Sequence, residues 1–392
     1  MEWLTRQLRQ LEAKGLRRTL RPLAASPYVE RDGRRLLNLA SNDYLGLSTD
    51  PRLTAAAREA LERWGVGAGA ARLVVGDRPV HEALEAALAA LKETEAALVF
   101  PSGYAANVGV LSALANPRDQ IFADALNHAS LNDGARLSRA RFRYYRHRDL
   151  EQLEQLLQGP GPAPGGRRFI VTDAIFSMDG TVAPLPELAE LAARYDAVLV
   201  VDDAHGTGIV GPEGRGTAHH LGVADRIPVQ VATLSKALGV QGGAALGSRA
   251  LVDYLLHRAR AFIYSTGISP VLAAAALEAV RLVQSDEGEQ RRRRQQAHIA
   301  RLKAGLEARG YTVRHEPPAP MLAVLVGAPE AALRLSALLE TRGVLAPAIR
   351  PPTVPPGTSR IRLAPMATHT DDDIEAALAA FPEAEAIQTH VA

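Results

Sequence analysis

The sequence predicts an α/β protein with a mostly parallel central sheet in a large domain, followed by a smaller α+β C-terminal domain. Short runs that are apolar throughout alternate with segments of helical periodicity, which is typical of parallel strands buried on both faces. Polar residues follow directly on five of these runs. After about residue 285 the composition changes to a polar helical segment, shorter apolar runs and a proline-rich loop.

Length and composition limit the classes of protein to be considered. The chain has 392 residues, and folding a chain of this size removes about three-quarters of its surface from water. Its 45 Lys and Arg against 43 Asp and Glu give a net charge of +2 without a dominant basic block, which argues against a nucleic-acid partner. The sequence has no cysteine, which excludes disulfides, a thiolate nucleophile and Cys-ligated zinc. The expected location is the reducing cytoplasm.

Neither a signal peptide nor a membrane span is expected. The N-terminal segment, residues 1–45, is expected to contain a helix and then extended chain. Leucines recur at helical spacing over residues 4–11 without the continuous apolar core of a signal peptide. The uncharged stretch 96–117 is long enough to cross a membrane. Pro101–Gly103 interrupts it near its start, so it is expected to form a strand, a turn and a helix.

The predicted large domain covers residues 46–285 and contains the central sheet. The apolar runs expected as strands are Ala96–Phe100, Gln120–Ala123, Phe169–Thr172, Ala197–Val201, Val229–Thr233 and Ala244–Gly247. Helical segments expected between them include Val80–Lys92, Ala105–Ala115 and Leu185–Arg194. Strands separated by helices in this way form parallel sheets.

The predicted small domain covers residues 286–392. Its expected elements are a polar helix at Glu289–Arg309, a strand at Met321–Val326, a further helix and a strand at Arg360–Leu363. The dense basic run Arg291–Arg294 follows several acidic residues. We interpret this run as the solvated start of a helix and not as a nucleic-acid site.

Polar residues at the ends of the apolar runs predict a ligand site. In open α/β sheets ligands bind at the carboxyl ends of the strands, which meet at one edge of a parallel sheet. The residues at these ends are Ser102–Tyr104, Asp124 with Asn127–Ser130, Asp173 with Ser177, Asp202–His205, and Thr233–Lys236. Connecting loops alone would not be expected to place polar groups of this kind at five strand ends of one sheet edge.

The chemistry of these residues points to a cofactor. Gly103 at a helix start lets backbone N–H groups approach a phosphate. An acid such as Asp202, about 4 Å from a ring nitrogen at an effective dielectric constant near 20, attracts its proton by roughly 4 kcal/mol, or about three pK units. Lys236 is one of only four lysines against 41 arginines, and a lysine amine can bind an aldehyde covalently. A phosphate site, an acid and an amine together describe pyridoxal phosphate (PLP), whose protonated ring accepts electrons.

Two other kinds of site are weighed and set aside. Gly206–Gly211 fits the pattern G-x-G-x-x-G, but Pro212–Gly216 after it predicts a loop instead of the helix that a dinucleotide site needs. Asp202 and His205 with His219 and His220 could suggest a metal site, but no complete ligand set emerges. No metal is expected.

Over nearly its whole length the chain resembles the α-oxoamine synthases, PLP enzymes of fold type I. The matching segments are Ser41–Gly46, Gly67–Gly76, Asp77–Glu85, Ser102–Tyr104, Asn127–Ser130, Phe176–Gly180, Val201–Gly208, Thr233–Gly239 and Tyr264–Thr266. Within this family, Arg350–Leu363 most resembles the member that condenses L-alanine with pimeloyl-CoA in biotin biosynthesis. The resemblance implies a fold type I PLP-dependent transferase, with residues 46–285 as the PLP-binding domain.

The resemblance also implies roles for individual residues. Lys236 would carry the cofactor and move the substrate's Cα proton. Asp202 would pair with the pyridine nitrogen, His205 with the phenolic oxygen, and His128 would stack on the ring beside the substrate. Cofactor groups, the phosphate included, would be held by Ser102, Gly103, Tyr104, Ser177 and Thr233, and from a partner subunit by Ser265 and Thr266. Arg362 would bind the carboxylate of the amino acid substrate, and Asn42, Arg21 and Thr353 would lie near the substrates.

The implied reaction is a decarboxylative condensation in a homodimer with active sites at the subunit interface. Glycine acetyltransfer from acetyl-CoA, or dual specificity, stays open, because one methyl group gives only about 1–3 kcal/mol of discrimination. A non-catalytic dimeric scaffold of the same fold is the alternative from another class. That alternative would be expected to have lost the lysine, whereas Lys236 stands in an intact motif.

Overall fold

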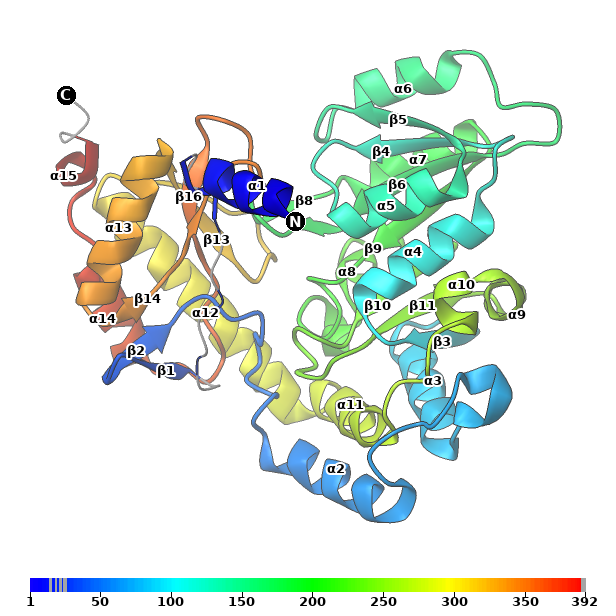
Figure 1. Cartoon of the computed structure of the whole chain (residues 1–392), viewed down its shortest axis with the longest axis horizontal. Helices are drawn as coiled ribbons and strands as arrows, with labels where there is room; N and C mark the ends of the chain where they lie inside the picture. Colours follow the sequence, from blue (N-terminus) through cyan, green and yellow to red (C-terminus); the bar gives the residue numbers. More distant parts are fainter. Residues whose placement is uncertain (14–15, 18–19, 21–22, 24–26, 389–392) are drawn as a thin grey trace.

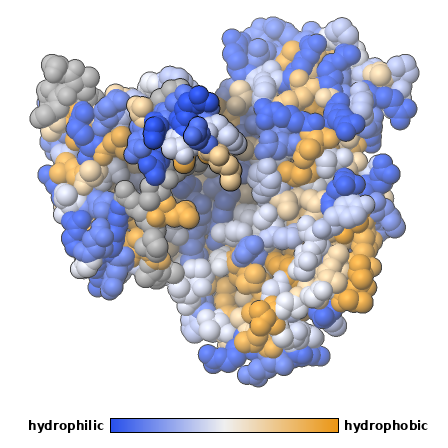
Figure 2. Space-filling model, in the orientation of Figure 1, coloured by the Kyte–Doolittle hydropathy of each residue, from blue (hydrophilic) through white to orange (hydrophobic). Residues whose placement is uncertain are grey.

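The computed structural model describes residues 1–13, 16–17, 20, 23 and 27–388. It has two lobes, each built on its own sheet (Figure 1). We call them the large lobe, which contains the seven-stranded sheet, and the small lobe, which contains the four-stranded sheet. The helix α12 (Asp286–Ala308) runs from the small lobe towards α11 (Pro270–Val283) of the large lobe (Figure 1). A notch separates the two lobes at the top of the view in Figure 2.

The large lobe contains the mostly parallel sheet that the sequence predicts. In spatial order its strands are β3 (Ala96–Phe100), β11 (Gly243–Gly247), β10 (Val229–Thr233), β9 (Ala197–Asp202), β6 (Arg168–Asp173), β4 (Gln120–Asp124) and β5 (Arg141–Tyr145). Strands β10, β9, β6, β4 and β5 run parallel, whereas β11 is antiparallel to both β10 and β3. The carboxyl ends of β3, β4, β6, β9 and β10 therefore lie at the same edge.

Both faces of this sheet are buried, which explains why its strands are apolar throughout. Leu98 and Phe100 of β3 pack in one core cluster, whereas Ala97 and Val99 pack in another. Successive side chains of a strand point to opposite faces, so the two clusters lie on opposite sides of the sheet. The helices of this lobe are α2 (Pro51–Trp64), α3 (Pro79–Leu91), α4 (Gly103–Leu114), α5 (Ala129–Ser138), α6 (Leu150–Gln158), α7 (Leu185–Arg194), α8 (Thr217–His220), α9 (Arg249–Arg258), α10 (Arg260–Ile263) and α11.

One strand of the large sheet has no counterpart among the predicted runs. All six predicted runs of the large domain lie in strands, but β5 was not predicted. It pairs only with β4 at the edge of the sheet, and its Arg141 and Arg143 are exposed. An edge strand that faces solvent does not need a continuous apolar sequence.

The small lobe packs the C-terminal part of the chain against N-terminal strands. Its four-stranded sheet has the order β12 (Thr312–Arg314), β13 (Leu322–Gly327), β16 (Ser359–Leu363) and β15 (Ala348–Ile349). Its helices are α12, α13 (Pro329–Thr341), α14 (Asp371–Ala380) and α15 (Ala384–Gln388). The hairpin of β1 (Tyr28–Arg31) and β2 (Arg34–Asn38) pairs with β14 (Val344–Leu345). The domain ranges 1–45, 46–285 and 286–392 stay predictions.

The expected N-terminal helix is present, and no membrane span is found. Helix α1 covers Glu2–Ala13, and no residue of it is buried. Within the described ranges, none of the helices has both the length and the apolar character that crossing a bilayer requires.

A buried ion pair fixes the loop after β9. Lys92 Nζ lies 2.6 Å from Asp203 Oδ2, and the two side chains are 0% and 1% exposed. Glycines make room for this pair, because a Cβ on Gly206 would lie 2.1 Å from Asp203 Oδ1 and one on Gly216 would lie 2.3 Å from Lys92 Nζ. The first glycine of the G-x-G-x-x-G pattern therefore has a packing role. The short 3₁₀ turn Pro212–Gly214 directly follows the pattern, in place of the helix that a dinucleotide site needs.

Replacing Lys92 by methionine should lower the free energy of unfolding by about 3–5 kcal/mol, because Asp203 would stay buried without its cation. Urea denaturation of the two proteins measures the difference. Lys303→Met is the matched control, since Lys303 is 34% exposed and lies 4.0 Å from Glu307. The control should change stability by less than about 0.5 kcal/mol. Equal losses in the two variants would contradict a stabilising role for the buried pair.

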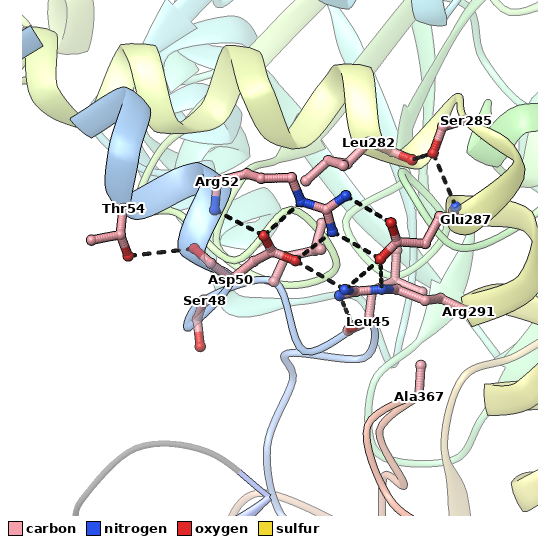
Figure 3. Close-up of polar contacts among 12 residues, drawn as sticks. Leu45, Ser48, Asp50, Arg52, Thr54, Leu282, Ser285, Glu287, Arg291 and Ala367 are labelled. Carbon is pink, nitrogen blue, oxygen red and sulfur yellow. Dashed lines mark hydrogen bonds and ion pairs between the residues drawn. The ribbon is translucent and has the colours of Figure 1, made fainter. Parts of the chain in front are cut away.

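A charge network joins the start of α2 to the start of α12 (Figure 3). Arg52 donates to the two oxygens of Glu287 at 2.7 and 2.8 Å, and to Asp50 at 2.8 and 2.9 Å. Arg291 contacts Asp50 at 2.9 Å and Glu287 at 2.7 Å, and donates to the Leu45 carbonyl at 3.0 Å. Hydrogen bonds from Arg52 lower the pKa of Asp50 and of Glu287 to about 2, so the network stays ionised at neutral pH.

The interpretation of Arg291–Arg294 as a solvated helix start is wrong for two of its residues. Arg292 is buried, donates to the Val283 carbonyl at 2.5 Å and pairs with Glu289 at 2.8 Å. Arg291 is held in the network described above, whereas Arg293 is 79% exposed. Contacts of α12 with α11 and with the segment that precedes α2, which the local sequence does not encode, remove the first two arginines from solvent.

Candidate active site

A cavity of about 210 Å³ lies at the carboxyl edge of the large sheet. It is lined by residues that follow β3, β6, β9 and β10 and by residues at the starts of α4 and α5. Nine predicted site residues line it, namely Ser102, Gly103, Tyr104, His128, Ser177, Asp202, His205, Thr233 and Lys236. The other lining residues are Asn107, Ser130, Asp173, Ala204 and Ser235. The strand ends that the sequence predicts to lie together therefore do meet, at one cavity.

Lys236 places an amine in this cavity, three residues after β10. Its Nζ lies 2.9 Å from His205 Nε2. Burial lowers the pKa of Lys236 to about 8, although the nearby Asp202 charge acts in the opposite direction. At pH 7 about a tenth of this amine is therefore unprotonated, far more than for an ordinary lysine. An unprotonated amine is both a nucleophile and a base.

Asp202, the last residue of β9, presents a carboxylate whose orientation is fixed by two donors. Its Oδ1 accepts from the Ala204 backbone N–H at 2.9 Å. Its Oδ2 accepts from Asn107 Nδ2 at 2.5 Å, and the same amide nitrogen contacts Ser130 Oγ at 2.9 Å. The sequence placed Ser130 among the polar residues at the strand ends without a role of its own, and it did not place Asn107 in the site. Asn107 could have been identified because its polar side chain interrupts the apolar residues of the helical run after Gly103.

His128 stands at the N-terminus of α5 and belongs to the same hydrogen-bond network. Its Nδ1 contacts Ser130 Oγ at 2.7 Å, and its backbone N–H donates to Asp173 Oδ2 at 2.6 Å. Burial lowers the pKa of His128. Burial, together with the charge of Asp202, raises the pKa of Asp173 well above its usual range. The imidazole is thus held at a set position on the cavity wall.

His205 connects the cavity to the N-terminal motif Ser41–Gly46. Its Nδ1 lies 2.6 Å from the hydroxyl of Tyr44, which is fully buried. Burial, with the Lys236 charge as a second cause, lowers the pKa of His205 well below its usual range. The imidazole is therefore neutral. Tyr44 lies within a motif that the sequence singled out, but the contact with His205 could not be predicted from it.

Arg362 reaches the site from the small lobe. It lies on β16, and its Nη2 donates to Asn42 Oδ1 at 3.0 Å and to the Tyr44 hydroxyl at 3.3 Å. Its Nε donates to the Ser177 carbonyl at 2.6 Å. The structure thus brings the predicted substrate residues Arg362 and Asn42 into contact with each other, beside a residue of the cavity wall.

A second arginine of β16 fastens the two lobes together. Arg360 is 1% exposed, and its Nη1 lies 2.5 Å from Asp179 Oδ1 and 3.1 Å from the Met178 carbonyl. Met178 and Asp179 lie between β7 (Ile175–Phe176) and β8 (Thr181–Val182) of the large lobe. Arg360 and Arg362 are two residues apart, so both side chains point to the same side of the strand.

The start of α4 offers a place for an anion. Ser102 caps this helix by accepting from the Ala105 backbone N–H at 3.1 Å. Gly103 follows it, and a Cβ there would lie 3.2 Å from Thr233 Oγ1, so the glycine allows the helix start and the end of β10 to pack closely. The first backbone N–H groups of a helix lack partners within it and attract anions. The neighbouring Tyr104 is half-exposed, and its hydroxyl lies 2.6 Å from Asp133.

These groups fit PLP. The cavity combines an amine of lowered pKa, a carboxylate held by two donors, two histidines and a helix start lined with hydroxyls. PLP presents an aldehyde, a ring nitrogen, a phenolic oxygen and a phosphate, for which these are the matching groups.

Besides Asn42 and Arg362, which contact each other beside the cavity wall, four predicted residues are not among those that line the cavity. Arg21 lies outside the described residues. Thr353 lines a separate cavity of about 510 Å³, together with Leu11 and Arg350. Ser265 and Thr266 follow α10, and Thr266 forms a β-bridge with Ala71 away from the cavity wall.

Comparisons with known proteins show the family of this chain. Residues 34–381 match the family model of class I and II aminotransferases. The chain is 50% identical to a protein named 8-amino-7-oxononanoate synthase from Anaeromyxobacter sp. strain K, over 97% of this chain and 95% of the relative. It is 46% identical to a protein of the same name from Herminiimonas arsenicoxydans, over 98% and 99% of the two chains.

Solved structures agree as well and confirm the predicted fold type. A serine palmitoyltransferase from S. paucimobilis with a bound PLP–myriocin adduct has a TM-score of 0.91 and 29% identity, over 98% of both chains. The 8-amino-7-oxononanoate synthase of Francisella tularensis has a TM-score of 0.77 and 27% identity, over 91% of this chain and 99% of that one. The chain therefore belongs to the class I and II aminotransferase family of PLP-dependent enzymes and, within it, to the α-oxoamine synthases.

Proposed function

We propose that this chain is a PLP-dependent acyltransferase that condenses L-alanine with pimeloyl-CoA. The products are 8-amino-7-oxononanoate, CoA and CO₂, and the reaction belongs to biotin biosynthesis. The observation that carries the proposal is that Lys236 and Asp202 line one cavity, while Arg362 donates to the carbonyl of Ser177 in its wall. Relatives that are 44–51% identical over nearly the whole chain, and that are named 8-amino-7-oxononanoate synthase, support this substrate pair.

The cofactor supplies the electron sink that draws charge away from the amino acid's Cα when PLP is bound. The protein supplies the acid, the base and the orientation. Asp202 would hold a proton on the ring nitrogen through its negative charge, and the donors from Ala204 and Asn107 keep this carboxylate in place. Arg362 binds the carboxylate of alanine through its planar guanidinium.

Lys236 moves the proton at Cα. Its unprotonated amine takes the proton from alanine, and the freed electron pair at Cα forms a bond to the thioester carbonyl carbon. The C–S bond then breaks, and CoA leaves as a thiolate. The carboxyl group of alanine departs as CO₂, and the proton returned by Lys236 to Cα completes the amino ketone. The pKa of Lys236, about 8, allows the amine to accept and to return a proton near neutral pH.

The remaining contacts with the cofactor and the substrates are assigned as the resemblance implies. His205 would contact the phenolic oxygen, and His128 would stack on the ring and border the substrate. Phosphate and other cofactor groups would be held by Ser102, Gly103, Tyr104, Ser177 and Thr233. The substrates would be bordered by Asn42, Arg21 and Thr353.

We also propose a homodimer with its active sites at the subunit interface. An exposed apolar cluster supports it, with Val66 75% exposed, Leu73 50%, Val74 71% and Val75 68%. Apolar side chains gather at the lower right of the view in Figure 2, over this part of the large lobe. The bridge from Ala71 ties Ser265 and Thr266 to the same region, from which they would reach the phosphate in the partner's site. The cytoplasm is the compartment proposed for this reaction.

An assay that measures CoA release from each pair of amino acid and acyl-CoA tests the proposal. We expect the catalytic efficiency with L-alanine and pimeloyl-CoA to exceed that with glycine and acetyl-CoA by at least about tenfold, as one added methyl group can give. Each acyl-CoA is also tested with the other amino acid, so that the preferences for amine and acyl chain are separated. A preference for glycine with acetyl-CoA would overturn the assignment to biotin biosynthesis and favour glycine C-acetyltransfer.

A further inference from the structure

The buried hydroxyl of Tyr44 lies between two groups of the site. Its oxygen is 2.6 Å from His205 Nδ1, and Arg362 Nη2 donates to it at 3.3 Å. Asn42 Oδ1 lies 3.3 Å from the same oxygen. The Tyr44 side chain is fully buried, so water does not compete for these hydrogen bonds.

The direction of each hydrogen bond follows from what each group can donate. A guanidinium only donates, so the Tyr44 oxygen accepts from Arg362. Burial raises the pKa of Tyr44 to about 12, so the phenol keeps its own hydrogen and can donate it. Two acceptors are within reach, and His205 Nδ1 is the nearer by 0.7 Å. Asn42 Oδ1 already accepts from Arg362.

We propose that Tyr44 is a positioning residue that fixes His205 in the tautomer with its hydrogen on Nε2. When the Tyr44 hydroxyl donates to Nδ1, this nitrogen must be the unprotonated one of a neutral imidazole. The hydrogen is then on Nε2, which lies 2.9 Å from Lys236 Nζ and faces the cavity.

This tautomer matters to Lys236. The N–H at Nε2 can donate to the lone pair of an unprotonated Lys236 amine. A protonated amine has no lone pair to accept this hydrogen bond, so the same N–H disfavours the ammonium form. Without the Tyr44 hydroxyl, the hydrogen of His205 can move to Nδ1, and Nε2 can then accept from a protonated Lys236. Tyr44 therefore favours the unprotonated amine that the chemistry needs. The tautomer also allows Nε2 to donate to the phenolic oxygen of PLP. Only this further consequence rests on the proposed function.

The nitrogen resonances of His205 test the proposal directly. The full-length protein, labelled with ¹⁵N at histidine, is compared with and without PLP, and His205 is assigned from the signal that His205→Asn removes. In the wild-type protein the structure predicts an unprotonated Nδ1 and a protonated Nε2. In Tyr44→Phe we expect the hydrogen to move to Nδ1 in part or in full. A wild-type hydrogen on Nδ1, or an unchanged pattern in Tyr44→Phe, would overturn the proposal.

Tyr311→Phe is the matched control, because it removes a mostly buried hydroxyl that donates to the Pro382 carbonyl at 2.9 Å in the small lobe. The control should leave the His205 signals unchanged. The wild-type measurement is decisive even if Tyr44→Phe folds poorly.

The pH dependence of PLP capture gives a second reading. The rate at which cofactor-free protein binds PLP covalently rises as Lys236 loses its proton, and this rise should move to higher pH in Tyr44→Phe by about half a unit to one unit, the size of one hydrogen bond. A shift of zero, or to lower pH, would contradict the proposal. Neither reading uses alanine or pimeloyl-CoA, so a failure here is distinguishable from a failure of the proposed reaction.

Discussion

Lys236→Ala should abolish turnover, with a loss of about 10⁴-fold in kcat, the upper range for removing a positioned acid–base group. The only amine among the residues that line the cavity would be gone. The loss should be seen as an absence of CoA release with L-alanine and pimeloyl-CoA. Mass spectrometry after borohydride reduction should find a pyridoxyl phosphate group on Lys236 of the wild-type protein and none on the variant.

Two controls separate base chemistry from charge and from folding. Lys236→Arg keeps the positive charge, but arginine does not lose its proton in proteins, so this variant should be as inactive as Lys236→Ala. Lys303→Ala, at a surface helix position, should keep full activity. If either Lys236 variant kept more than about a tenth of the wild-type rate, Lys236 would not be the base, since a positioned base contributes at least about 10²-fold.

Asp202→Asn should still bind PLP but should lose roughly 10²–10³-fold in the rate of Cα proton exchange. The ring proton loses an attraction of roughly 4 kcal/mol, or about three pK units, when the charge is removed at a distance of about 4 Å. The substitution preserves the shape of the side chain. Asn107 has a buried Oδ1 without a hydrogen-bond partner in the described structure, and a flip of this side chain would give the amide introduced at position 202 an acceptor.

Deuterium incorporation at Cα of L-alanine, followed by NMR without acyl-CoA, measures this step alone. PLP absorbance of the purified variant shows whether the cofactor is still bound. The exposed Asp225, replaced by asparagine, is the control for loss of one negative charge. Near-normal exchange in Asp202→Asn would contradict the assigned role of this carboxylate.

Residues near one another in the chain, or at the ends of neighbouring parallel strands, could be placed from the sequence. Fully buried strands must be apolar on both faces, so β3, β6, β9 and β10 were recognisable as continuous apolar runs. A parallel arrangement brings their carboxyl ends to one edge. This alone predicted that Asp202, Thr233 and Lys236 would share a site with Gly103.

The sequence by itself thus determined the type of fold, the edge of the sheet that carries the site, and the amine and acid at its centre. Only the tertiary structure decided which partners hold these groups in place. Tyr44 meets His205 across 161 positions of the chain, and Arg362 meets the Ser177 carbonyl across 185. Such contacts depend on how the lobes and helices pack, and no local periodicity or propensity records that packing.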